Sequence, residues 1–185
     1  MVGLALTLAA PAAASAQSAG TGGGGAAFVP PPPPAKRAKI VDGIAIPPKK
    51  APRRVKRTIA WANQIVRKPY VYGGGHKPFK LLRRKLDRGY DCSGAVSHAL
   101  WGGRFLRRLP LNSSGFMRWG EPGEGRWVTV YTNPGHAYVV IAGLRFDTSL
   151  GDRSTRREVS SGDGPRWREY RRSPRGFAAR HPRDF

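Results

Sequence analysis

The stretch from Gly89 to Leu100 constrains this chain more than any other, because it holds the only cysteine among the 185 residues. Asp91 has a side chain that is preferred at helix N-caps, so the sequence predicts a helix whose first turn carries Cys92. The dipole and the unpaired N–H groups of a first turn favour a negative thiolate over a neutral thiol. Cys92 is therefore a candidate nucleophile, and an inert buried thiol is the alternative.

The apolar residues after Cys92 predict which side of this helix packs against the core. Cys92 shares helical spacing with Val96, Ala99 and Leu100. The sulfur is then expected at the buried end of this stripe. Two glycines at 102–103 are expected to end the helix.

Apolar segments in the second half of the chain predict strands over 127–131, 136–142, 144–148 and 176–181. The cysteine helix and a helix that begins at Thr58 as its N-cap precede these strands and do not alternate with them. This order predicts an α+β fold with an antiparallel sheet. Residues 151–175, rich in Arg, Ser and Gly, are expected to form a surface loop.

Composition divides the chain into three sections. Residues 1–16 are an apolar run that ends in Ala-Ser-Ala, the small-x-small pattern of a signal peptide cleavage site. Residues 17–57 combine a glycine run, five consecutive prolines and basic side chains, and are predicted to be a disordered linker. Residues 58–185 are expected to form the folded, catalytic domain. The first run is too short to span a membrane, so export without a transmembrane anchor is expected; a disordered Ala-rich tail is the alternative.

The formal net charge of +22 favours polyanionic partners. Anionic cell-wall polymer suits an exported protein, whereas no recognition motif of a DNA or RNA module occurs, so no specific nucleic acid is expected. A solvated linker whose charge only keeps it soluble is the alternative for the basic residues before Thr58. A single cysteine excludes an internal disulfide and a cysteine-based zinc site, and no metal or cofactor is expected.

A thiolate nucleophile needs a base, and four histidines compete for that role. His98 lies six residues after Cys92 on the same helix, and the helical rotation turns it away from the sulfur. His76 in a glycine loop and His181 near the end of the chain are expected to be surface or packing residues. His136, which opens the most apolar strand, is the predicted base.

Asp147 is the candidate that orients the base. If residues 142–143 form a two-residue loop, strand pairing sets Tyr138 opposite Asp147, and Asp147 becomes the diagonal neighbour of His136 on the same face. A three-residue loop would reverse the parity and present Thr148 instead. An acid in a turn at the strand end, without any such role, is the other alternative.

Three motifs together resemble the NlpC/P60 family of cell-wall cysteine peptidases. They begin at Pro69 (Pro-Tyr-Val-Tyr-Gly-Gly-Gly), at Tyr90 (Tyr-Asp-Cys-Ser-Gly) and at Gly135 (Gly-His-Ala-Tyr-Val-Val-Ile). The resemblance covers residues 60–149. It implies a papain-like α+β fold, in which the nucleophilic cysteine at a helix N-terminus packs on an antiparallel sheet that carries the histidine.

The resemblance also implies a reaction and a place for it. The reaction is hydrolysis of amide bonds in peptidoglycan stem peptides, often between D-glutamate and the diamino acid, by a secreted, wall-associated or periplasmic enzyme without a cofactor. The implied catalytic residues are Cys92 as nucleophile, His136 as base and Asp147 as its orienting group. The implied substrate-binding residues are Tyr70, Asp91 and Ser93, with Asp91 available to meet a free amine.

The chain departs from the family pattern at three places, the first of which is Asp147, because the third polar residue of the family is more often His, Asn or Gln than Asp. Gly125-Arg-Trp-Val stands where the family usually has Gly-Asp-Leu-Val, and the Arg-rich segment after Ser149 has no counterpart. Two other functions fit the same residues: a non-catalytic wall-binding protein of this fold, and a thiol acyltransferase that moves an acyl group to an amine instead of water.

Overall fold

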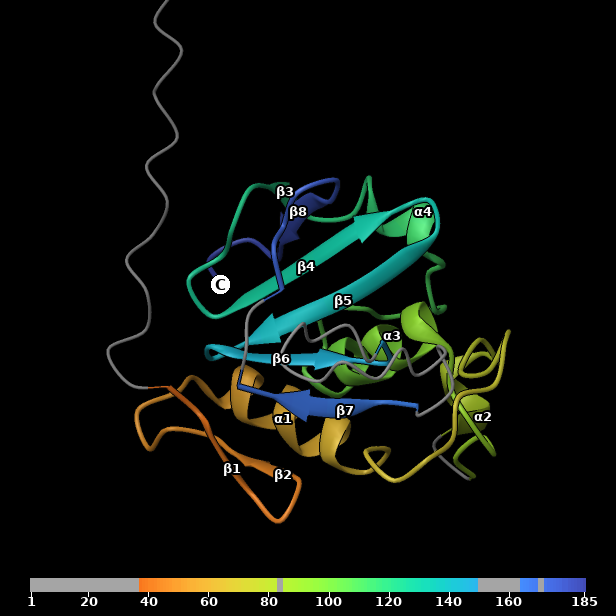
Figure 1. Ribbon diagram of the computed structural model, residues 1–185, viewed down its shortest axis with the longest axis horizontal. Coiled ribbons are helices and arrows are strands. Elements are labelled where there is room, and N and C mark those ends of the chain that lie inside the picture. Colours follow the sequence, from red (N-terminus) through yellow and green to blue (C-terminus); the bar gives the residue numbers. More distant parts are fainter. Residues whose placement is uncertain (1–36, 83–84, 150–163, 170–171) are drawn as a thin grey trace, which may run out of the picture.

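Six strands form an antiparallel sheet, and helices cover one of its faces (Figure 1). The computed structural model describes residues 37–82, 85–149, 164–169 and 172–185. The order of neighbouring strands is β3-β8-β4-β5-β6-β7. The strands are β3 (Glu121–Pro122), β4 (Val128–Asn133), β5 (His136–Ile141), β6 (Leu144–Asp147), β7 (Arg166–Arg168) and β8 (Ala178–His181).

Two eleven-residue helices, α1 (Arg53–Asn63) and α3 (Cys92–Gly102), pack against each other and against the sheet. Shorter helices are α2 (Phe79–Leu82) and α4 (Ser113–Phe116). A separate hairpin of β1 (Lys39–Val41) and β2 (Ile44–Ile46) precedes α1. The predicted α+β class with an antiparallel sheet is confirmed.

The strands give the sheet two different faces. In β5, the odd-numbered residues from Ala137 to Ile141 join the main core with the helices, whereas Tyr138 and Val140 join a second cluster on the other face. Successive side chains of a strand point to opposite faces. His136 and Asp147 therefore belong to the same face as Tyr138.

Helix α3 is buried on nearly every side. Val96, Ala99 and Leu100 face the core as predicted, but Ser97 and His98 on the rest of the helix are completely buried as well. The cause is the position of α3, which contacts both α1 and the sheet. The predicted one-sided stripe therefore describes only part of this helix, although its end at Gly102 is as predicted.

The folded region begins before Thr58, which corrects the predicted linker boundary. The β1–β2 hairpin and the first turn of α1 lie within the segment that was expected to be disordered. The Asn63 side chain accepts from the N–H of Ala45 at 3.1 Å and donates to its carbonyl at 2.9 Å, which ties the hairpin to α1. The strands of the hairpin are mostly apolar, and Ala38, Ala45 and Ala51 are buried, but the basic residues around them gave the whole segment the composition of a linker.

The start of α1 also differs from the prediction. Pro52 occupies the N-cap, and Thr58 lies inside the helix, where its hydroxyl donates to the carbonyl of Arg54 at 2.9 Å. Proline suits the start of a helix because N–H groups there have no acceptor within the helix, so the N–H that proline lacks is not needed. The predicted helix is present, but it begins at Arg53, before the predicted N-cap Thr58.

The predicted surface loop over 151–175 contains a strand. Within its described residues, β7 pairs with β6, and the buried Trp167 lies opposite Phe146. The Trp167 indole N–H donates to the Asn63 side chain at 2.8 Å. In the three-residue strand β7, only the central tryptophan is buried. A strand this short cannot be predicted from periodicity.

Among the helices of the described residues, none has the length and apolar composition needed to cross a membrane. The predicted signal peptide at 1–16 and the predicted linker from 17 to 36 lie outside the described residues.

Candidate active site

Cys92 is the first residue of α3, and Asp91 is the N-cap, as predicted. The Asp91 carboxylate accepts a hydrogen bond from the Gly94 N–H at 2.7 Å. Cys92 is a free and partly exposed thiol, so its sulfur is not at a buried end of the helix as was expected. Its position combines solvent access with the positive end of the helix dipole.

The β5–β6 hairpin brings His136 and Asp147 together. Residues 142–143 form its two-residue loop with φ values of 48° and 84°, the signs of a type I′ turn. Ile141 pairs with Leu144, which is the predicted register. His136 Nε2 and Asp147 Oδ1 are 2.9 Å apart, so the geometric prediction that Asp147 meets this histidine is confirmed.

The charge state of His136 depends on Asp147 and Cys92. Burial acts to lower the pKa of His136, but the hydrogen bond with Asp147, a hydrogen bond with Cys92 and the charges of both partners raise it to about 9. The imidazole is therefore protonated at neutral pH.

Asp147 is almost completely buried, and several groups besides His136 face it. Ser149 donates its N–H to Oδ1 at 3.0 Å and its hydroxyl to Oδ2 at 2.8 Å. Arg145 Nε and Arg172 Nη1 lie 3.6 and 3.9 Å from Oδ2. Burial acts to raise the pKa of Asp147, but the hydrogen bond with His136 and the other partners hold it below its usual range, so the carboxylate is ionised.

Arg145 is a member of the site that the sequence reasoning missed. Its side chain is 0% exposed, and among the described residues its guanidinium has no hydrogen-bond partner, only the ion pair with Asp147. Burial lowers the pKa of Arg145, and the charge of Asp147 acts in the opposite direction. The signal that could have found it is strand alternation, because a residue two before Asp147 shares its face.

His76 also lies beside the start of α3, in a contact with Asp91 that the sequence did not predict. Its Nε2 lies 3.0 Å from Asp91 Oδ1 and 3.1 Å from Oδ2, and 3.3 Å from the Ser93 hydroxyl. A second histidine–carboxylate pair thus lies at the start of the cysteine helix. The path of the glycine loop in the folded protein brings His76 to Asp91, and the sequence contains no local signal that predicts this contact.

Asp91 has several partners within the chain, which bears on the role implied for it. Besides Gly94 and His76, it accepts from the Gly73 N–H at 3.1 Å and from the Ser93 hydroxyl at 3.2 Å. Burial acts to raise the pKa of Asp91, but the His76 and Gly94 hydrogen bonds hold it below its ordinary value. A substrate amine would have to compete with His76 for this carboxylate.

Tyr70 lies beside the same group of residues. It forms a parallel bridge with Tyr90, just before the cysteine helix. Burial raises the pKa of Tyr70, and electrostatic interactions with Cys92 and Asp91 raise it further. The three residues that the family resemblance assigns to substrate binding, Tyr70, Asp91 and Ser93, are therefore neighbours at one end of α3.

Close backbone packing explains two of the glycines. A Cβ on Gly94 would lie 2.1 Å from the carbonyl oxygen of Gly74, and a Cβ on Gly74 would lie 2.4 Å from that of Gly89. The glycine loop 73–75 therefore lies directly against the first turn of α3. This contact carries His76 to Asp91.

The remaining histidines do not join Cys92. The His98 ring packs against Trp61 and Tyr90 at centroid distances of 5.1 and 5.3 Å, and burial lowers the pKa of His98 to about 4. It is a neutral core residue, whereas the helix geometry had predicted only that it turns away from the Cys92 sulfur. His181 is in β8.

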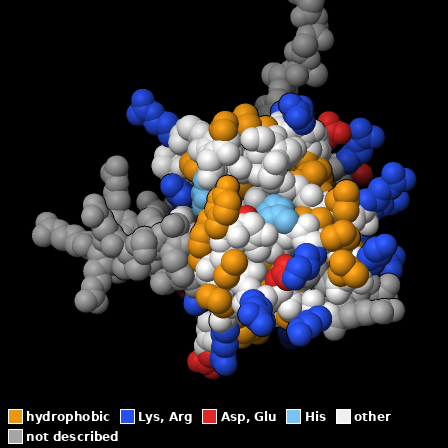
Figure 2. Space-filling view, turned by 90° about the vertical axis from the view of Figure 1, so that its right-hand side faces the viewer, with side chains coloured by type: hydrophobic (Ala, Val, Ile, Leu, Met, Phe, Trp, Pro, Cys, Tyr) orange, Lys and Arg blue, Asp and Glu red, His pale blue; other side chains and the backbone are white. Residues whose placement is uncertain are grey.

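On the face shown in Figure 2, histidine side chains lie among hydrophobic and uncharged groups, with most Lys and Arg around the margin.

Within the described part of the chain, no group of three or more His, Cys, Asp or Glu side chains could hold a metal ion. The titratable side chains described around Cys92 include two imidazoles and two carboxylates. In comparisons with protein-family models and with curated proteins, neither search found a match to this chain.

Proposed function

We propose that this protein is a secreted cysteine hydrolase that cleaves amide bonds in peptidoglycan stem peptides. The observation that carries the proposal is the pairing of His136 with Asp147 beside Cys92, with the pKa of His136 raised to about 9. A nucleophile, a base and a group that orients the base form the minimum set for covalent acyl transfer.

The first half of the proposed reaction forms a thioester. The Cys92 thiolate attacks the carbonyl carbon of the amide, and the π electrons of the carbonyl move onto its oxygen. As the tetrahedral intermediate collapses, the C–N bond breaks and the His136 imidazolium gives its proton to the leaving amine. Asp147 holds the imidazole in the orientation that this transfer needs.

The second half releases the acyl group. Neutral His136 takes a proton from a water molecule, whose oxygen attacks the thioester carbonyl. The C–S bond then breaks, leaving a carboxylic acid product and restoring the thiolate and the imidazolium.

The start of α3 offers donors for the developing negative oxygen. The first N–H groups of a helix have no intrahelical acceptor. Asp91 occupies the N–H of Gly94, whereas those of Cys92 and Ser93 have no acceptor in the described parts of the chain. We assign these two N–H groups to the oxyanion, where such donors are worth several kcal/mol in the transition state (about 3 each).

The substrate class rests on the resemblance to NlpC/P60 peptidases in the motifs at Pro69, Tyr90 and Gly135. The apolar run at 1–16 and the net charge of +22 support export and retention on an anionic wall. We also propose, on the basis of the same resemblance, that the α+β fold is of the papain-like kind.

Digestion of purified cell-wall sacculi in H₂¹⁸O tests this proposal. We expect new amine termini and one ¹⁸O atom in each new carboxylate, and loss of both in Cys92→Ala. Ser114→Ala, an exposed position on α4, is the matched surface control and should retain activity. Full activity in Cys92→Ala would overturn the proposal, and products without ¹⁸O but with a new acyl–amine bond would show acyl transfer instead.

A further inference from the structure

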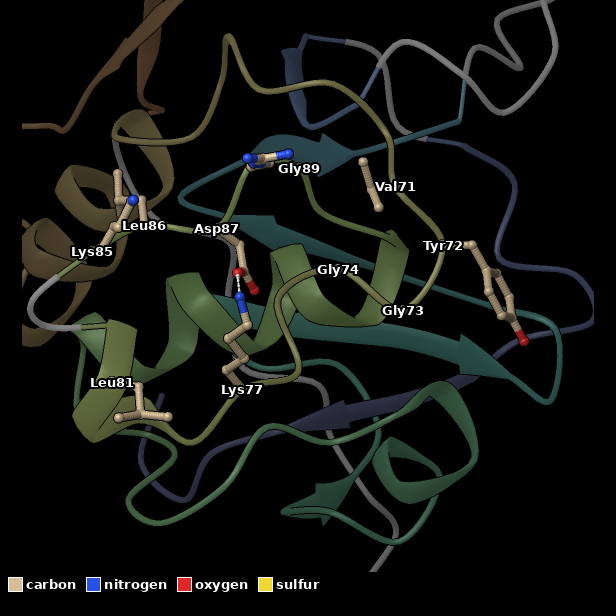
Figure 3. A pocket seen from close by; sticks show the side chains of 11 residues that line it. Val71, Tyr72, Gly73, Gly74, Lys77, Leu81, Lys85, Leu86, Asp87 and Gly89 are labelled. Carbon is tan, nitrogen blue, oxygen red and sulfur yellow. Dashed lines mark hydrogen bonds and ion pairs between the residues drawn. The ribbon is translucent and has the colours of Figure 1, made fainter.

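A pocket of about 490 Å³ lies beside the glycine loop, and none of the proposed catalytic residues lines it. Its walls come from residues 71–74 on one side and from Lys77, Leu81 and residues 85–89 on the other (Figure 3). The exposed side chains of Val71, Tyr72 and Leu81 give it apolar surface. The remaining side chains that line it include three cations and one carboxylate.

The one carboxylate, Asp87, is already occupied. Its Oδ1 accepts from Lys77 Nζ at 2.5 Å, and its Oδ2 accepts from the Gly75 N–H at 3.0 Å. Figure 3 shows the Lys77 and Asp87 side chains turned toward each other across the pocket. This pair cancels the charge of Lys77, so the pocket retains the positive charges of Lys85 and Arg88.

Lys85 and Arg88 have no acidic partner among the described residues. Both are exposed and line the pocket. Among the residues that line the pocket, three are basic and one is acidic. A concave wall of one sign focuses the field and attracts ions of the opposite sign.

The basic wall is anchored to the core. Phe79 of α2 is buried and stacks on Trp101 of α3 at a centroid distance of 4.7 Å. At the other end of the segment, the Asp87 N–H donates to the Tyr90 hydroxyl at 3.3 Å, and Tyr90 is completely buried. Phe79 and Asp87 therefore connect the described residues of this region to the buried core.

The pocket and the cysteine lie on either side of the same glycine loop. Gly73 and Gly74 line the pocket, and their backbone groups also bond to the N-cap of α3: the Gly73 N–H donates to the Asp91 carboxylate, and the Gly74 carbonyl accepts from the Asp91 N–H. A polymer that reaches Cys92 would thus have the pocket next to it.

We infer that this pocket is an anion-binding subsite, in which Lys85 and Arg88 hold a phosphate or carboxylate group of the polymer that is cleaved at Cys92. The identity of that polymer rests on the proposed function, whereas the binding of an anion does not. Arginine and lysine both form charge-assisted hydrogen bonds with such groups. The apolar side chains beside them cover the carbon skeleton that carries the anion.

Binding measured without catalysis tests the inference. The full chain carrying Cys92→Ala is titrated calorimetrically, at low ionic strength, with a glycerol phosphate oligomer and separately with an oligo-γ-glutamate of equal charge. Lys85→Glu with Arg88→Glu is the pocket variant. Arg107→Glu with Arg108→Glu, two exposed residues beyond the C-terminal end of α3, makes the same change in net charge and is the control.

We expect the pocket variant to bind one of the two oligomers about tenfold or more weakly, and the control to change affinity less than about threefold. Loss with the phosphate oligomer alone assigns a phosphate ligand, and loss with the glutamate oligomer alone assigns a carboxylate. Equal losses in the pocket variant and the control, or no binding of either oligomer, would overturn the inference. If Cys92→Ala still cleaves sacculi while the pocket variant loses binding, the proposed function fails and the anion subsite stands.

Discussion

Two histidine–carboxylate pairs lie near Cys92, and they are built differently. His136 and Asp147 come from neighbouring strands, and the carboxylate is buried against Arg145. His76 reaches Asp91 from a loop, and that carboxylate is held mainly by N–H groups and a hydroxyl. Similar distances in the two pairs therefore do not imply similar roles.

The partners of each carboxylate explain the difference. Asp147 has its charge balanced by an imidazolium and guanidinium groups, so its main effect is electrostatic and acts on His136. Asp91 satisfies the backbone of the loop and of the first turn of α3, so its main effect is to hold the helix start in place. We therefore assign chemistry to the sheet pair and positioning to the loop pair.

Replacing the histidines should separate the two pairs most strongly. We expect His136→Ala to lower kcat/KM for wall peptide by about 10²- to 10⁴-fold, because it removes the group that transfers protons. His76→Ala should lower kcat/KM by less than about tenfold, since it leaves the Cys92–His136 pair intact. Steady-state kinetics on a soluble stem peptide would check both, and equal losses would contradict the assignment.

Replacing the carboxylates should separate them in stability. Asp147→Ala leaves the buried Arg145 guanidinium without its ion-pair partner and should lower the free energy of unfolding by about 3–5 kcal/mol. Asp91→Ala removes an N-cap and should cost about 1–2 kcal/mol. Urea denaturation of both variants measures the difference, and a smaller loss for Asp147→Ala would show that Arg145 is stabilised by other groups.

The pH dependence should be dominated by His136. Its pKa is raised from 6.5 to about 9, so its proton stabilises the folded state fully below about pH 6.5, and this contribution is lost as the pH rises through about 9. Because the imidazolium is also the proposed proton donor, activity and stability should fall together over that interval. Proton NMR titration of the imidazole gives the pKa directly.

Asp147→Asn sharpens the pH comparison. It removes a negative charge beside His136, so the fall in activity should begin at a lower pH than in the unaltered protein. If activity in this variant falls at the same alkaline pH as in the unaltered protein, a group other than His136 causes that fall.

The smallest expected effect is the contribution of His76 to stability. His76→Ala removes one partner of a carboxylate that keeps its N–H donors and the Ser93 hydroxyl, so it should cost about 1 kcal/mol. His181→Ala is the matched control, because the one hydrogen bond of its ring among the described residues is with the neighbouring carbonyl of Pro182, so stability should change less. A loss above that of Asp91→Ala would mean that His76 supports more than the helix start.

The hairpin shows how far sequence reasoning can reach at this site. The meeting of His136 and Asp147 follows from a two-residue loop and strand alternation, and both are local properties. Cys92 at the first turn of a helix follows from Asp91 in the same way. Helix capping, turn geometry and strand alternation each act over a few positions of the chain. They were therefore sufficient to place Cys92, His136 and Asp147.

The regions that were read wrongly depend on distant contacts. The β1–β2 hairpin is held by Asn63, and β7 is held by its pairing with β6 and by the same Asn63 side chain. The β7 segment has too few apolar residues to predict its structure by itself, whereas β1 and β2 are apolar strands around an Asp-Gly turn whose signal was concealed by the basic residues on either side. Their burial comes from elements far along the chain, so their composition suggested a linker and a loop.

Local sequence alone therefore determined the helix that carries Cys92, the antiparallel hairpin and the pairing of His136 with Asp147. Tertiary structure alone decided that Arg145 is buried behind Asp147, that His76 binds Asp91, and that a basic pocket adjoins the cysteine helix. The physical reason is that turn geometry and strand alternation act between near neighbours, whereas burial and charge balance depend on which surfaces the fold brings together.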